Sequence, residues 1–144
     1  MKLNIIERRA LRRPRHWKGH VLTNNRQLIE AYWSHASARD WPAFGALLAE
    51  DVLYDMPQTR ERIRGKAAYV EFNATYPGQW RLEVLRLLVD GARAVSEIAF
   101  TVDGELATGI SFFEIENGLI TAITDHWPSA GTAPARPISG IEHY

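Results

Sequence analysis

The sequence predicts an α+β domain in which three helices cover a cone-shaped, curved antiparallel sheet. The first half of the chain contains three segments with apolar residues at helical spacing. The second half contains four segments rich in apolar, aromatic and β-branched residues, separated by Asp90-Gly91, Asp103-Gly104 and Asn117-Gly118. Because such dipeptides tolerate the positive φ angles of tight hairpins, the four segments should form an antiparallel meander. Helices that precede a long meander can cover one of its faces.

Length and composition fit one globular domain with a segment on either side. The chain has 144 residues, of which 46% are hydrophobic and 24% charged. We expect a basic N-terminal arm at 1–22, a folded domain at 23–128 and a C-terminal tail containing Pro and Gly at 129–144. There is no run of about 18 apolar residues and no apolar segment typical of a secretion signal near the N-terminus. We therefore expect a cytoplasmic protein without a membrane partner.

The net charge of zero combines a basic arm with an acidic body. Residues 1–20 carry seven Lys or Arg and one Glu, which gives +6, so the remaining chain carries −6. Such an arm can contact nucleic acid or anionic lipid, but it is more often solvated or packed on an acidic body. The chain has no RNA-reading aromatic motif, and we expect no nucleic-acid partner. Without Cys and without clustered His, we also expect no metal site.

Capping residues mark the three expected helices. Asn24 can cap the first helix, which should run to about Arg39. Asp40 can cap a second, short helix that has Pro42 in its first turn. The third helix is expected at Lys66–Thr75, because a Pro-Gly dipeptide follows it closely.

One strand is expected before the third helix and four after it. Val52–Met56 should form the first strand, and Gln58–Arg64 should form a loop behind it. The alternating apolar residues of the second half then predict the meander strands Trp80–Val89, Ala92–Val102, Leu106–Glu116 and Leu119–Trp127.

The last strand poses a question of register, because Asp125 and His126 are adjacent. On a regular strand only one of them can face the interior. A two-residue turn at Asn117-Gly118 would turn His126 inward. A three-residue turn, with a bulge at the glycine, would place Asp125 opposite Gly109 and on the face of Ser111. We favour the three-residue turn, since it sets a small residue beside the carboxylate.

Three segments carry a family resemblance: IEAYWSHASARDWPAFGALLAEDVLYDMP, RIRGKAAYVEF and FFEIENGLITAITDHWP. They resemble the opening helices and strand, the glycine-then-helix segment and the closing hairpin of the nuclear transport factor 2-like superfamily. The similarity is greatest to its SnoaL-like polyketide cyclase and ketosteroid isomerase branches, and it extends over about residues 24–128. It implies the cone fold and a scaffold that hosts many chemistries.

The resemblance also implies roles for individual residues. Tyr32 falls where ketosteroid isomerases keep the tyrosine that polarises the substrate carbonyl. Met56 and Ser111 fall where those enzymes keep their two catalytic aspartates, so steroid isomerisation by that mechanism is not expected. The same alignment instead turns two acids into the cavity, Glu97 from the second meander strand and Asp125 from the fourth. In SnoaL-like cyclases a cavity-facing carboxylate of a late strand acts as the base.

These roles predict acid/base chemistry without a cofactor, by a cyclase, isomerase, dehydratase or hydrolase. Asp125 would be the base, Glu97 a second acid, and Tyr32 and Tyr54 hydroxyl donors to a developing oxyanion. An apolar cavity would raise the pKa of both carboxyl groups. The substrate would be a small apolar carbonyl or cyclic compound, and the residues expected to bind it are Met56, Phe72, Tyr76, Ser111, Phe113 and Trp127.

Each candidate also has a structural interpretation. Glu97 can pair with an arginine, Asp125 can accept backbone hydrogen bonds at a strand end, and Tyr32 can pack in the core. The chain would then be a non-catalytic ligand-binding or dimerisation module. Two acids opening into one cavity without salt-bridge partners would favour catalysis. In either case the apolar outer face of the sheet predicts a homodimer, through residues that include Ile98, Phe100, Ile110 and Phe112.

Overall fold

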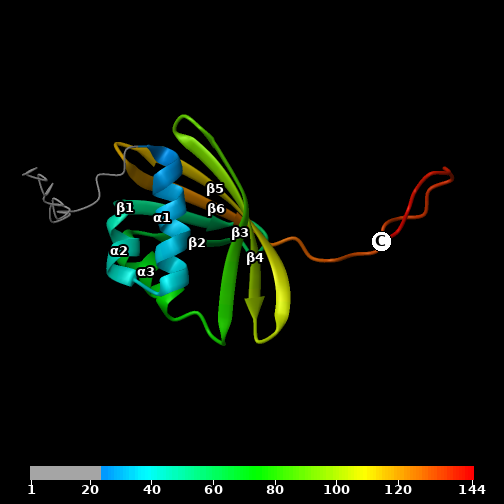
Figure 1. Cartoon of the computed structure of the whole chain (residues 1–144), viewed down its shortest axis with the longest axis horizontal. Helices are drawn as coiled ribbons and strands as arrows, with labels where there is room; N and C mark the ends of the chain where they lie inside the picture. Colours follow the sequence, from blue (N-terminus) through cyan, green and yellow to red (C-terminus); the bar gives the residue numbers. More distant parts are fainter. Residues whose placement is uncertain (1–23) are drawn as a thin grey trace, which may run out of the picture.

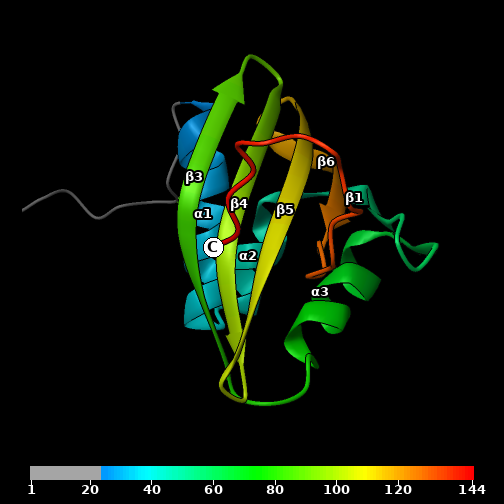
Figure 2. The ribbon, with the colours of Figure 1, turned by 90° about the vertical axis from the view of Figure 1, so that its right-hand side faces the viewer.

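The computed structural model describes residues 24–144. Its six strands form one curved sheet in the order β2-β1-β6-β5-β4-β3, and three helices cover one face of this sheet (Figure 1). A view from the side shows that α1 and α2 lie behind the long strands, while α3 lies near β1 (Figure 2). The α+β class, the three helices and the antiparallel meander are confirmed.

The helices begin where capping side chains predict. The side-chain oxygens of Asn24 and Asp40 accept hydrogen bonds from backbone N–H groups in the first turns of α1 (Asn25–Ala38) and α2 (Trp41–Ala46). These bonds satisfy donors that the helix itself leaves unpaired. Helix α3 (Lys66–Ala74) follows a glycine with φ +93° and has no side-chain cap.

The sheet has one strand more than expected. Gln58–Arg64 is not entirely a loop, because Glu61–Arg64 pairs antiparallel with the preceding strand. This edge strand has one apolar residue, Ile63, so its sequence lacks the alternation that would have revealed it. The first strand also begins earlier than expected and pairs in parallel with the last. The strands are β1 (Leu48–Met56), β2 (Glu61–Arg64), β3 (Trp80–Asp90), β4 (Arg93–Val102), β5 (Glu105–Glu116) and β6 (Leu119–His126).

The concave face of β4 differs from the expected one. A two-residue turn between β4 and β5 places Ser96 opposite Ser111, and both are buried. Trp33 Nε1 donates a hydrogen bond of 3.0 Å to Ser96 Oγ, which joins α1 to this face. Since side chains alternate along a strand, Ile98 shares the concave face and Glu97 lies on the convex one. The expected inward orientation of Glu97 is therefore wrong.

The turn before β6 is tight, yet Asp125 still faces inward. Asn117-Gly118 forms a two-residue turn with φ angles of +49° and +74°, so the three-residue turn is wrong. A bulge follows, because Thr121 has no partner residue on β5. This extra residue shifts the register by one, so that Asp125 lies opposite Ser111 and His126 faces the other side.

The bulge also explains how two isoleucines of β6 reach the same core. Ile120 and Ile123 are three residues apart and would point to opposite faces of a regular strand. Both are nevertheless fully buried and belong to one hydrophobic cluster with side chains of α1, α2 and β1. The bulged register thus satisfies the core and the inward carboxylate at once.

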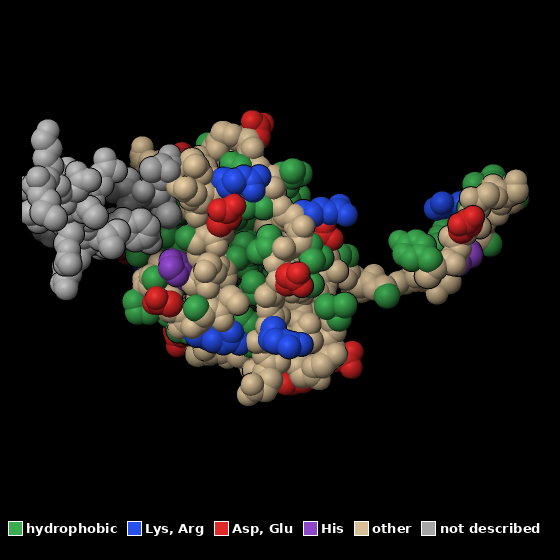
Figure 3. All heavy atoms as spheres, in the orientation of Figure 1, with side chains coloured by type: hydrophobic (Ala, Val, Ile, Leu, Met, Phe, Trp, Pro, Cys, Tyr) green, Lys and Arg blue, Asp and Glu red, His purple; other side chains and the backbone are tan. Residues whose placement is uncertain are grey.

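The convex face retains exposed apolar side chains. Leu88, Leu106 and Phe112 are 66%, 73% and 50% exposed. Ile110 also lies on this face, whereas the expected members Ile98 and Phe100 face the interior. Pairing of two copies through this face remains a prediction. A space-filling view of a different face shows hydrophobic side chains at its centre, with acidic and basic ones interspersed (Figure 3).

The expected arm at 1–22 lies outside the described residues. Residues 129–144 form no helix or strand and lead away from the sheet (Figure 1). Within residues 24–144, no helix has the length and apolar character needed to cross a membrane.

The bulged register can be tested by truncating neighbouring side chains of β6. Ile120→Ala should lower the free energy of unfolding by about 2–5 kcal/mol, because it leaves a cavity in the core. Leu119→Ala, the matched control, should cost less than about 1 kcal/mol, since Leu119 is 37% exposed. Urea unfolding monitored by circular dichroism measures both values. Equal losses would contradict the register.

Candidate functional site

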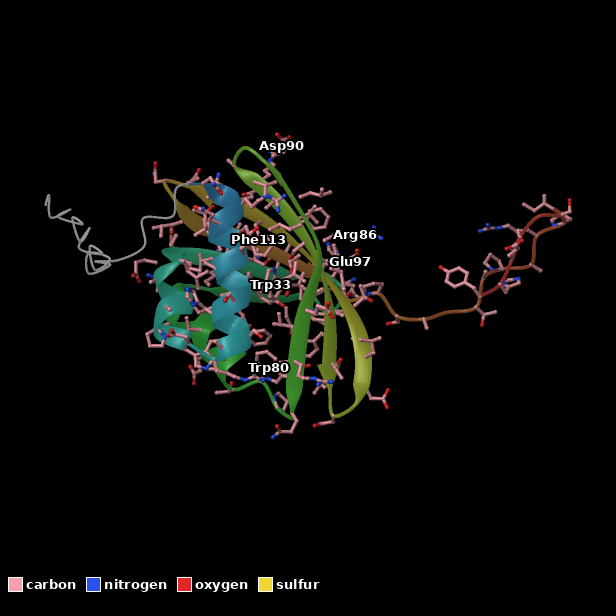
Figure 4. All side chains as sticks on the ribbon, viewed as in Figure 1. Trp33, Trp80, Arg86, Asp90, Glu97 and Phe113 are labelled. Carbon is pink, nitrogen blue, oxygen red and sulfur yellow. The ribbon has the colours of Figure 1, made fainter. Side chains whose placement is uncertain are left out.

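A cavity of about 390 Å³ lies between the concave face of the sheet and helices α1 and α3. Its wall is largely aromatic, and the remaining lining residues are mostly aliphatic. Trp33 and Trp80, on α1 and β3, lie between helix and sheet in Figure 4. The aromatic lining residues are Tyr32, Trp33, Tyr54, Tyr69, Phe72, Tyr76, Trp80, Phe100 and Trp127.

Asp125 brings a carboxylate to this apolar wall. Asp125 is 8% exposed, and two hydroxyl groups donate hydrogen bonds to its carboxylate. Ser111 Oγ donates to Oδ1 at 2.6 Å, and Tyr54 Oη donates to Oδ2 at 3.0 Å. Among the residues that the structure describes, no Lys, Arg or His lines the cavity. The carboxylate is thus held by neutral donors and not by a counter-ion.

Burial controls the protonation of this carboxyl group. Loss of hydration raises the pKa of Asp125 to about 6, against the opposing effects of the bonds from Ser111 and Tyr54 and of nearby His126. The group is therefore mostly ionised at neutral pH and can accept a proton. A base with a pKa near the working pH suits general base catalysis.

Two further tyrosines form a hydrogen-bonded pair in the cavity wall. Tyr32 Oη and Tyr69 Oη are 2.5 Å apart, and both residues are buried. Burial raises the pKa of both phenols, and the charge of Asp125 raises them further, so both remain protonated. One hydroxyl donates to the other, and the accepting hydroxyl keeps its own proton for another acceptor. The pair can supply a hydrogen bond to a substrate oxygen.

Glu97, the second predicted acid, lies outside the cavity. Its carboxylate is 3.1 Å from the guanidinium of Arg86 on the neighbouring strand. Figure 4 shows both side chains on the side of the sheet away from α1. The cavity therefore contains one of the two predicted acids, and Glu97 has the structural role of an ion-pair partner.

The predicted substrate-binding residues separate into two groups. Met56, Phe72, Tyr76 and Trp127 line the cavity, whereas Ser111 and Phe113 do not. Ser111 lies behind the cavity and binds the carboxylate, as described above. Phe113 packs in the core, with its ring centroid 5.1 Å from that of Tyr32 (Figure 4). Tyr54 lines the cavity, but its hydroxyl donates to Asp125 and is not free for a substrate oxygen.

Sequence reasoning missed four aromatic members of the wall: Trp33, Tyr69, Trp80 and Phe100. Tyr69 lies one helical turn before Phe72 on α3, a spacing that marks a shared face. Phe100 could have been placed from the tight turn after β4, which sets it on the face of Ser96. Trp80 had no comparable signal, because it begins β3 at the edge of the sheet.

Trp127 is positioned by its neighbours on two sides. A Cβ atom at Gly109 would lie 2.8 Å from Trp127 Cη2, so the indole requires a glycine at this position of β5. Gln58 holds the backbone of Trp127 with both ends of its amide: Nε2 donates to the carbonyl oxygen at 2.8 Å, and Oε1 accepts from the N–H. The loop after β1 thereby fixes one wall of the cavity.

Among residues 24–144, no group of three or more His, Cys, Asp or Glu side chains is arranged to hold a metal ion.

The curved sheet, its helical cover and the cavity between them define a nuclear transport factor 2-like fold. Residues 29–123 match the SnoaL-like domain family, and the chain belongs to this family. Among proteins with curated descriptions, none matches the chain.

Solved structures show the same relationship. A presumed ketosteroid isomerase from Kribbella flavida is 43% identical over 83% of this chain and 88% of its own, with a TM-score of 0.80. An NTF-2-like protein of unknown function from Burkholderia xenovorans is 26% identical over 81% and 94% of the two chains, with a TM-score of 0.69. A presumed polyketide cyclase from Pseudomonas putida is 30% identical over 70% and 89%, with a TM-score of 0.59.

The raised pKa of Asp125 makes stability depend on pH. The folded-state pKa of about 6 exceeds the reference value of 3.8, so the folded protein binds the proton more tightly. The stabilisation of the folded state by this bound proton is complete below about pH 4 and is lost as the pH rises through 6. Relative to Asp125→Asn, the wild type should lose about 2–3 kcal/mol of unfolding free energy between pH 4 and pH 8.

Denaturant unfolding at several pH values measures this difference. Glu97→Gln is the matched control: it removes a carboxylate of the convex face and keeps Asp125, so it should lose stability between pH 4 and pH 8 as the wild type does. A difference between wild type and Asp125→Asn that stays constant from pH 4 to pH 8 would contradict the buried, titrating carboxyl group.

Proposed function

We propose that this chain is an enzyme that uses Asp125 as a general base, without a cofactor, on a small carbonyl-containing or cyclic substrate. The observation that carries the proposal is a buried carboxylate that opens into an aromatic cavity and has no counter-ion among the lining residues. Two hydroxyl donors orient it, and burial sets its pKa near 6. A group held in this way is arranged for proton transfer.

The proposed step is removal of a proton from a carbon next to a carbonyl group. The proton passes to a carboxylate oxygen of Asp125, and the electron pair of the broken C–H bond moves toward the carbonyl oxygen. The Tyr32–Tyr69 pair then stabilises the resulting enolate by a hydrogen bond to that oxygen. Ser111 and Tyr54 keep the base oriented. In an unsaturated ketone the enolate is conjugated with the C=C bond, and return of the proton from Asp125 to the far end of that bond gives isomerisation. Attack of the enolate carbon on a second carbonyl gives cyclisation, and the alkoxide that forms takes the proton back from Asp125.

The relatives support this class of reaction. The two named activities among them, ketosteroid isomerase and polyketide cyclase, belong to the Kribbella flavida and Pseudomonas putida proteins. Here Met56 lies at the cavity wall where the resemblance places the proton-shuttling aspartate of ketosteroid isomerases. The proposal therefore assigns the base to β6 instead of β1. It uses one carboxylate, because Glu97 lies on the convex face and the expected pair of cavity acids is not formed.

A substrate panel with matched variants tests the base. Lactones, enones and small cyclic ketones are incubated with the wild type, with Asp125→Asn and with Glu97→Gln, and product is followed by chromatography. Asp125→Asn should lower kcat/KM by about 10²–10⁴-fold, the usual contribution of a general base. Glu97→Gln should retain activity within about twofold.

The pH profile supplies a second measurement on the same reaction. Because the ionised carboxylate accepts the proton, kcat/KM should rise with pH through about 6 and then level off. Turnover unaffected by Asp125→Asn would refute the role of this residue. Ligand binding without turnover on any member of the panel would instead favour the non-catalytic binding module.

A further inference from the structure

The cavity around Asp125 carries one negative charge that its own walls do not balance. The partners of the carboxylate are neutral: Ser111 from β5 and Tyr54 from β1. The phenols of Tyr32 on α1 and Tyr69 on α3 are uncharged as well, since burial raises the pKa of both. An ionised group in a poorly hydrated site attracts positive charge over several ångströms, because little water screens it.

His126, the histidine next to Asp125 in sequence, does not enter the cavity. His126 follows Asp125 on β6 and points to the opposite face, where its ring contacts that of Phe112 with a centroid distance of 5.9 Å. Glu97 lies on that same opposite face and pairs with Arg86. Among the lining residues, the charge that a ligand meets is therefore that of Asp125.

Four aromatic rings gather at one part of the wall. The ring centroid of Phe100 lies 5.5 Å from that of Tyr76, 5.6 Å from that of Trp80 and 5.5 Å from that of Trp127. Tyr76 is 43% exposed, so this group reaches solvent at the mouth of the cavity. The electron-rich faces of such rings attract organic cations, most strongly when the cation is weakly hydrated.

One of these rings already contacts a cation. The guanidinium carbon of Arg39 lies 3.8 Å from the ring centroid of Trp80. The same side chain donates hydrogen bonds to the backbone carbonyls of Ser37 and Trp80, which hold it in place. A second cation inside the cavity would find rings of the same kind, together with a carboxylate.

We propose that the ligand of this cavity bears a compact substituted ammonium group that lies against Tyr76, Trp80, Phe100 and Trp127 and is attracted by the charge of Asp125. The inference rests on the proposed function, because it names the class of substrate on which the same base would act. A volume of about 390 Å³ leaves room beside such a group for the apolar or carbonyl-bearing part of the molecule. Anionic substrates would be rejected by like-charge repulsion.

Three molecules of nearly equal shape and different charge test the inference without any turnover. Choline is the cation, 3,3-dimethylbutan-1-ol is its neutral carbon counterpart, and 3,3-dimethylbutanoate is the anion. Isothermal titration calorimetry at pH 7.5 should give choline an affinity about tenfold or more above that of the alcohol, with the anion weakest. Equal affinities of choline and the alcohol, preference for the anion, or no choline binding at millimolar concentration would overturn the inference.

Variants separate the two sources of attraction. Asp125→Asn should remove most of the preference for choline over the alcohol and leave the affinity for the alcohol in place, which also shows that the cavity is intact. Phe100→Leu should weaken choline binding more than alcohol binding, because it removes a ring and keeps an apolar side chain. Glu97→Gln, the matched control, should change neither affinity. An unchanged choline preference in Asp125→Asn would refute the role of this charge.

Acidification gives an independent readout. Lowering the pH from 7.5 to 5 protonates most of Asp125 and should weaken choline binding by up to about tenfold, while the alcohol is unaffected. The same dependence should persist in His126→Gln. Cation preference without turnover would refute the proposed enzyme but not this inference. Turnover without cation preference would refute this inference but not the proposed enzyme.

Discussion

The position of one carboxylate on the concave face depends on a single extra residue in the last strand. The tight turn at Asn117-Gly118 would by itself turn His126 toward the cavity. Thr121 adds one unpaired residue after that turn, and its hydroxyl donates to the carbonyl oxygen of Glu114 at 3.2 Å. From there to its end, β6 presents Asp125 to the interior. A local irregularity of backbone pairing thus decides which ionisable group the cavity contains.

An ionised carboxylate in an apolar cavity opposes folding, and the structure limits this cost without removing it. Ser111 and Tyr54 donate to its two oxygens, yet its pKa remains raised because neither donor restores the lost hydration. A purely structural aspartate would gain from a nearby cation, as Asp55 does from Arg62 on the exposed edge. The absence of such a partner among the lining residues of Asp125 leaves its charge available to a proton or a ligand.

The shape of the cavity is preserved by contacts that do not involve the carboxylate of Asp125. Gly109 lets the Trp127 indole lie close over β5, and Gln58 fixes the backbone at the same point. On the other side, Trp33 binds Ser96 and so ties α1 to β4. These contacts keep the helices and the sheet apart, and the aromatic side chains line the space between them without filling it.

Local signals determined the helices, the caps of the first two and the meander, because capping, periodicity and turn dipeptides act within a few residues. The orientation of Glu97 could also have been predicted from these signals, because a two-residue turn at Asp103-Gly104 places Glu97 opposite Ile110. Strand β2 and the bulge at Thr121 came only from tertiary structure. One depends on pairing with β1, and the other on the burial of Ile120 and Ile123 in one core. The sequence by itself therefore determined the helices and the meander, and long-range pairing decided that Asp125, and not His126, faces the cavity.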